Sequence, residues 1–128
     1  MKKLFIVVIM TMLCGCVTNT KNINIESECK NNAVSLSRLL REPLWTIDND
    51  RINVIMESFL VSNKCVYIDI VETNKKSPSY DKAKKGYDFI KDKINDLDQG
   101  YYIASENIVY DAKGEEQKLG VVRVVFKE

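Results

Sequence analysis

The stretch DNDRINVIMESFLVSNKCVYIDIVET, residues 48–73, decides the fold. Its first half carries apolar residues at the i, i+3, i+4, i+7 and i+8 positions, a spacing that predicts a helix with one buried face. Asp48 stands before this helix as a candidate N-cap. The apolar positions are Ile52, Ile55, Met56, Phe59 and Leu60.

The second half of the stretch changes period. From Cys65 to Thr73 β-branched residues are abundant and neighbouring side chains alternate in character, which predicts a strand. Val66, Ile68 and Ile70 are expected on one face of this strand, and Tyr67 and Asp69 on the other. The sequence therefore predicts a helix followed directly by a strand.

Two further helices are predicted on either side of this unit. The first begins at about Glu26 and ends at Pro43, with Cys29, Ala33, Leu36, Leu39 and Leu40 at helical spacing. The second follows a polar break at 74–78 and ends at Gly100, with Gly86 weakening it. Its apolar residues are Tyr80, Ala83, Tyr87, Ile90, Ile94 and Leu97.

The C-terminal third is predicted to be β structure. Strands are expected at 101–104, 107–110 and 119–126, with a turn at 111–114 and with Val122, Val124 and Phe126 on one face. Short links between late strands indicate an antiparallel sheet, and three amphipathic helices must cover it. The predicted fold class is α+β, a small antiparallel sheet covered by amphipathic helices, in one domain at 26–128.

The N-terminus has the order of an export signal: a cationic start, an apolar run at 4–13, then small residues. The run is too short to cross a bilayer. Its end, Leu13-Cys14-Gly15-Cys16, resembles the lipobox of bacterial lipoproteins, although Cys14 is an uncommon occupant of its position. The alternative is an ordinary secreted protein with two clustered cysteines.

The lipobox resemblance implies cleavage after Gly15 and attachment of fatty acyl chains to Cys16, which would hold the protein on a membrane. Residues 1–15 are then the signal peptide and 16–25 a flexible tether. Val17 stands where an aspartate is the usual inner-membrane retention signal of enterobacteria. The resemblance therefore implies the cell envelope and, in a Gram-negative host, the periplasmic face of the outer membrane.

The mature chain keeps two other cysteines, Cys29 and Cys65. A disulfide between them is plausible in an oxidising compartment, and two buried thiols are the alternative. The chain has no histidine, so a metal site is not expected, and neither a catalytic motif nor a cofactor motif is present. We therefore expect no enzyme, and a formal charge of +1 over the whole chain gives no basis for nucleic-acid binding.

The mature chain also resembles extracytoplasmic PAS-like, Cache and CHASE sensor domains of histidine kinases and diguanylate cyclases. The resemblance lies in the helix end Pro43-Leu44-Trp45, the acidic Asp48 before the second helix, the strand that follows, and the closing hairpin from Asn107 onward. It implies a PAS-like fold. No binding-loop pattern of these sensors is found at 74–100, so no ligand-binding residue can be assigned.

Individual residues were weighed as site candidates. Trp45 is expected to fill the core, the alternative being a ligand site. Asp48 and Asp50 are explained better by capping and solvation than by acid–base catalysis. The tyrosines Tyr80, Tyr87, Tyr101, Tyr102 and Tyr110 are expected to be half-buried, the alternative being an aromatic pocket or a partner surface. The lysines Lys75, Lys76, Lys82, Lys84 and Lys85 are expected to form a solvated face, the alternative being a surface that binds anionic headgroups or peptidoglycan.

Two functions follow from the sequence. In the first, a lipid-anchored PAS-like module binds a small ligand or an envelope sensor protein. In the second, the same domain is an accessory interaction lipoprotein of a secretion, conjugation or exclusion system and has no small-molecule ligand. A cavity between the sheet and residues 74–100 would favour the first, and a filled core with an exposed aromatic or apolar patch the second.

The anchor makes a direct prediction. Replacing Cys16 by Ser removes the acceptor thiol, so the variant should lose labelling by a clickable fatty acid and leave the membrane fraction. Unchanged membrane retention of the variant would contradict the lipobox assignment.

Overall fold

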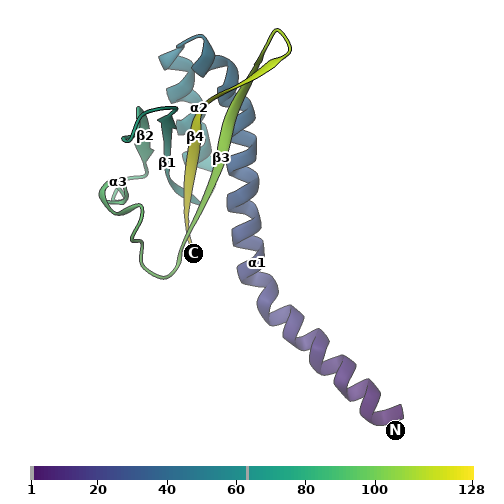
Figure 1. The fold of residues 1–128 in the computed structure, drawn as a ribbon. Coiled ribbons are helices and arrows are strands. Elements are labelled where there is room, and N and C mark those ends of the chain that lie inside the picture. Colours follow the sequence, from purple (N-terminus) through teal and green to yellow (C-terminus); the bar gives the residue numbers. More distant parts are fainter. Residues whose placement is uncertain (1, 63) are drawn as a thin grey trace.

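The computed structural model describes residues 2–62 and 64–128, with side chains for 24–61 and 64–128 (Figure 1). The side chains of the predicted leader, of Cys16 and of 17–23 in the predicted tether lie outside this part. The elements are α1 (Lys2–Trp45), α2 (Asn49–Ser62), β1 (Cys65–Glu72), β2 (Tyr80–Ala83), α3 (Ile90–Lys93), β3 (Tyr101–Ala112) and β4 (Glu115–Lys127).

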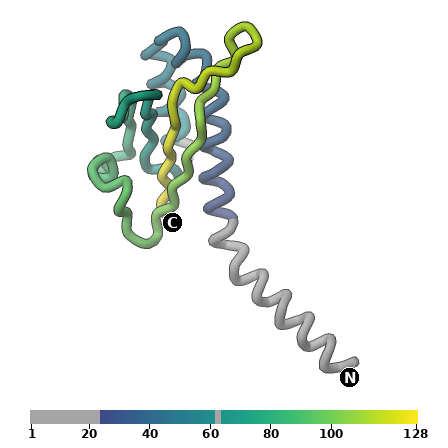
Figure 2. Tube along the Cα trace, in the orientation of Figure 1, coloured from purple at the N-terminus to yellow at the C-terminus, as the bar shows by residue number. Residues whose placement is uncertain are grey.

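The four strands form one antiparallel sheet in the order β2-β1-β4-β3. Helix α1 packs on β3 and β4, and α2 packs on β1 and β2, so both helices cover the same face (Figure 1). Figure 2 shows the described part of α1 running beside β3 from the end where the chain terminates to the end that carries the β3–β4 hairpin. The α+β prediction is confirmed.

The side chains pack in two layers, one on each face of the sheet. The larger layer joins the apolar stripe of α1, from Ile25 to Leu44, to the α2 stripe and to the inner faces of β1, β3 and β4. Ile25 is buried, so the packed domain begins one residue before the predicted boundary. The smaller layer, on the other face, consists of Val66, Tyr67, Ile90, Ile94 and Val125 with half-buried neighbours.

Helix α2 agrees with its prediction. The Asp48 carboxylate accepts a hydrogen bond from the Arg51 amide at 3.2 Å, and the Asp48 carbonyl accepts one from Ile52 at 3.0 Å. Asp48 is therefore the predicted N-cap. Ile52, Met56 and Leu60 are buried in the larger layer.

The end of α1 differs from its prediction. The helix continues past Pro43 to Trp45, because the amide of Thr46 still bonds to the carbonyl of Glu42 at 3.0 Å. The amides of Asp48 and Ile47 then bond to the carbonyls of Pro43 and Leu44, and Ile47 has φ +55°. This is a Schellman termination with isoleucine at the left-handed position that glycine usually takes.

Strand β1 is confirmed, but Val66 does not lie on the predicted face. A register irregularity between Cys65 and Tyr67 turns Val66 to the same side as Tyr67, in the smaller layer. Cys65, Ile68 and Ile70 face the helices. A bulge of this kind adds one residue to one strand and reverses the alternation locally.

The helix predicted over 80–97 is wrong. Tyr80–Ala83 instead pairs with β1 as the edge strand β2, and only the short α3 is helical. Gly86 lies between them at φ +93°, a conformation that interrupts a helix. The predicted apolar residues still reach the sheet, because Ile90 and Ile94 are buried and Tyr87 and Leu97 pack beside them.

The late strands are longer than predicted. The strands expected at 101–104 and 107–110 are one continuous β3, which continues through the predicted turn residues 111 and 112. The turn itself is tight, with Lys113 at φ +55° and Gly114 at φ +84°, as in a type I′ hairpin. Val122, Val124 and Phe126 share the buried helix-facing side as predicted.

The left-handed isoleucine makes a prediction about stability. Ile47 is 74% exposed, so its side chain contributes little packing, while a β-branched residue in this conformation costs about 1–2 kcal/mol. Ile47→Gly should keep or raise the free energy of unfolding, by up to about 1 kcal/mol, since glycine also loses more chain entropy. Urea unfolding measures this. Ile47→Ala, which keeps the strain, is the control, and a loss above about 1 kcal/mol in Ile47→Gly would show that the side chain packs.

Candidate functional site

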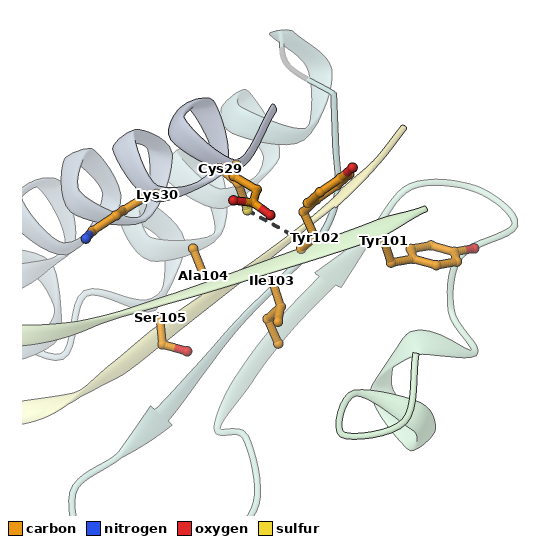
Figure 3. A pocket seen from close by; sticks show the side chains of 8 residues that line it. Cys29, Lys30, Tyr101, Tyr102, Ile103, Ala104 and Ser105 are labelled. Carbon is orange, nitrogen blue, oxygen red and sulfur yellow. Dashed lines mark hydrogen bonds between the residues drawn. The ribbon is translucent and has the colours of Figure 1, made fainter. Parts of the chain in front are cut away.

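A groove lies between α1 and β3, with a volume of about 410 Å³ (Figure 3). Glu26, Cys29 and Lys30 of α1 line one side, and residues 101–105 of β3 line the other. In Figure 3 Tyr102 and Ala104 point toward α1, whereas Ile103 and Ser105 point to the opposite face of the sheet. Much of this wall is therefore strand backbone, and the groove is open to solvent along the outer edge of β3.

The two cysteines predicted as a disulfide lie in the same buried layer, and both are thiols in this structure. Cys29 Sγ lies 3.6 Å from the carbonyl oxygens of both Tyr102 and Val124, to either of which it can donate. Cys65 Sγ donates to the Tyr67 carbonyl at 3.3 Å. The disulfide between Cys29 and Cys65 stays a prediction.

Burial controls the chemistry of these thiols. It raises the pKa of Cys29 to about 11 and that of Cys65 to about 12, and the nearby Cys29 contributes to the shift of Cys65. The thiolate is the nucleophilic form of cysteine. At neutral pH both cysteines are therefore protonated, and the groove holds no activated nucleophile.

The face of the sheet opposite α1 carries a buried ion pair. Asp69 of β1 is fully buried and accepts hydrogen bonds from Arg123 Nε at 2.7 Å, from Arg123 Nη2 at 2.5 Å and from the Tyr67 hydroxyl at 2.9 Å. Burial and the adjacent Asp69 charge raise the pKa of Tyr67, while the bond to Asp69 raises the pKa of Arg123. Each carboxylate oxygen has a donor, so this cluster is explained as a structural cross-link between β1 and β4.

The space between the sheet and residues 84–100 is filled. Ile90 and Ile94 pack on Val66, Tyr67 and Val125, and Tyr87, Leu97 and Tyr101 close the sides. The Phe89 ring meets that of Tyr101 edge-on, with centroids 6.4 Å apart. The described residues of this segment thus form a packed second layer in the place where a ligand cavity would favour a small-molecule sensor.

Trp45 is not the core residue that the sequence predicts. It is 41% exposed and stacks on Tyr110 of β3, with ring centroids 4.6 Å apart and ring planes 7° from parallel. Exposed Ile47 follows two residues later. We call Trp45, Ile47 and Tyr110 the distal patch, because Trp45 is the last residue of α1, 20 positions after Ile25.

Sequence reasoning missed the distal patch. Trp45 and Tyr110 lie far apart in the sequence, and no local pattern pairs them. The sequence singled out Trp45 and Tyr110 only separately, and a further signal was Ile47, an apolar residue between a helix end and the capping residue Asp48, where glycine or asparagine is usual.

The other candidates have structural explanations. Asp50 is exposed in the first turn of α2, which suits its charge. The Tyr80 hydroxyl donates to Asn49 Oδ1 at 2.5 Å, and the ammonium group of Lys127 lies 4.4 Å above the Tyr101 ring. At least two of the five lysines have carboxylate partners: Lys75 pairs with Glu72 at 3.6 Å and Lys82 pairs with Glu57 at 3.2 Å.

Two searches of the described residues found nothing. No group of side chains there could hold a metal ion, and no helix there is long and apolar enough to span a membrane. Comparison of the chain with protein-family models, curated proteins and solved structures gave no significant match.

The raised thiol pKa values make stability depend on alkaline pH. Because the pKa of folded Cys29, about 11, exceeds the 9.0 of a free thiol, its stabilisation is complete below pH 9 and is lost as the pH rises toward 11. The difference corresponds to about 3 kcal/mol. Urea unfolding of the reduced protein at several pH values should show this loss, and Cys29→Ala should show less of it. If the oxidised protein shows the same loss, no disulfide has formed.

Proposed function

We propose that this protein is a lipid-anchored lipoprotein of the bacterial envelope that acts by binding another envelope protein through the distal patch. It would serve as an accessory part of a secretion, conjugation or exclusion system. Its domain would present a fixed surface to that partner and use no small-molecule ligand.

The conformation of Ile47 carries this proposal. A β-branched side chain in the left-handed region strains the backbone, and at 74% exposure it offers little packing in return. Glycine would complete the same helix end without strain. Exposed Ile47 follows two residues after Trp45, whose ring stacks on Tyr110, and aromatic anchors are enriched in protein-binding hot spots.

Rigidity supports the same role. Trp45 belongs to the last turn of α1, and Tyr110 belongs to the long strand β3. Both elements contribute residues to the larger layer, so packing fixes the backbone that carries the two rings. An ordered patch loses less conformational entropy on binding than a mobile one.

The filled second layer argues against the small-ligand alternative. A cavity between the sheet and residues 74–100 would favour the small-ligand role, and within 84–100 Ile90, Ile94 and Tyr87 pack against the sheet instead. The groove beside β3 lies at the edge of the sheet and is open to solvent. A small-molecule site usually encloses most of its ligand.

A PAS-like fold and an outer-membrane location are parts of the same proposal. The helix ending at Trp45, the Asp48 cap, strand β1 and the closing β3–β4 hairpin support the PAS-like resemblance. The lipobox resemblance at Cys16 supports the anchor. From Cys16 to Ile25 the chain has a reach of about 30 Å when extended, which keeps the domain close to the bilayer.

Site-specific photo-crosslinking tests the patch. A photoreactive phenylalanine at Ile47 should give a discrete adduct with one envelope protein in living cells. The matched control is the same probe at Val54, which is 65% exposed on α2. Trp45→Ala should remove the adduct at Ile47 while the protein remains folded by circular dichroism. Equal adducts at Ile47 and Val54, or none at Ile47, would contradict the proposal.

A further inference from the structure

The outer edge of β3 has free hydrogen-bonding groups. The Glu128 amide donates to the Gly100 carbonyl at 2.8 Å, so Gly100 and Glu128 face each other as a hydrogen-bonded pair. From this pair onward, every second residue of β3 bonds to β4. Residues 102, 104, 106 and 108 therefore bond to β4. The backbone groups of Tyr101, Ile103, Ser105 and Asn107 point the other way, and we call them the open edge.

The open edge lacks the usual protection. Natural edge strands are commonly blocked by lysine, by proline, by bulges or by shortness. Strand β3 has neither lysine nor proline, and its register irregularity comes only at Ile108 and Val109. The first eight residues of β3 are thus a regular template for another strand.

We propose that the occupant of the open edge is the same strand of a second copy, paired antiparallel about a two-fold axis at Ala104. This register pairs Tyr101 with Asn107 and Ile103 with Ser105 of the second copy. Every residue of the open edge then exchanges two hydrogen bonds with its partner. The two four-stranded sheets become one continuous sheet.

Small side chains occupy the centre of this register. Ala104 faces Ala104 of the second copy in a pair without hydrogen bonds, in which side chains approach most closely. Ala104 points toward α1, so its small size leaves room for both helices (Figure 3). Glu106, the only charged residue at 101–108, faces Tyr102 and not the other Glu106.

The flank of α1 beside the edge is also self-complementary. It begins at Glu26 and Lys30, which line the groove, and helical spacing continues it to exposed Arg41. Cys29 contacts Tyr102, so Ala104 lies about one helical turn further along α1, near Ala33. Glu26 and Arg41 are nearly equidistant from that point.

The two-fold axis therefore brings Glu26 of each copy next to Arg41 of the other. The two α1 helices run antiparallel on the same face of the joined sheet, with opposite charges facing each other at both ends of the contact. The paired strand residues, 101–107, include neither Cys16 nor a residue of the distal patch, so the strand pairing does not require the proposed function.

Light scattering of the purified mature protein in detergent, with the detergent mass subtracted, tests the dimer over a wide concentration range. Ser105→Pro removes an outward amide that β4 does not use, and proline is tolerated at such edge positions. It should raise the dimer Kd at least tenfold, whereas the matched variant Ser105→Thr, which keeps the amide, should not.

Charge reversal tests the register. Glu26→Arg should weaken the dimer, and adding Arg41→Glu should restore it. A protein that is monomeric throughout, or a dimer insensitive to both Ser105→Pro and Glu26→Arg, would overturn the inference. An adduct of the Ile47 probe with a second copy of this chain would be a product of the dimer, whereas an adduct with a different protein tests the distal patch, so the two proposals fail separately.

Discussion

The contact between the apolar stripe of α1 and the inner face of β3 and β4 is the constraint on which the rest of the structure depends. Leu36 and Leu40 are fully buried against a layer that contains Ile108 and Phe126. Each such side chain contributes about 1.5–3 kcal/mol when buried. The same contact aligns α1 with the edge strand, and so it creates the groove, the flank beside the open edge and the stacking of Trp45 on Tyr110.

On the face of the sheet opposite α1, a buried ion pair fixes the register between β1 and β4. A slip of one residue between β1 and β4 would separate Asp69 from Arg123 and leave a fully buried carboxylate without its partner. A buried ion pair adds little net stability, but an unpaired buried charge is strongly destabilising. Asp69 and Arg123 thus exclude wrong registers, while Ile90 and Ile94 cover the neighbouring apolar positions.

The parts of the fold that follow from local pattern could be predicted from the sequence. The α2 stripe, the Asp48 cap and β1 are of this kind, because one buried face leaves a periodic signal. The structure of residues 80–97 could not be predicted. Their apolar residues recur every three or four positions, as in a helix, but a short edge strand and a loop that reach the same apolar face produce the same spacing. The distal patch and the open edge arise from contacts and pairing between distant segments, which no local pattern contains.

At both proposed surfaces the chain carries a feature that is unfavourable for the isolated domain. Ile47 accepts backbone strain that glycine would avoid, and β3 leaves an unprotected edge that invites pairing. An edge of this kind is an aggregation hazard in a protein that diffuses freely as a monomer. Pairing with a second copy would occupy it in a closed, two-fold arrangement. A lipid anchor would favour that arrangement, because confinement to one membrane raises the effective concentration of each copy for the other.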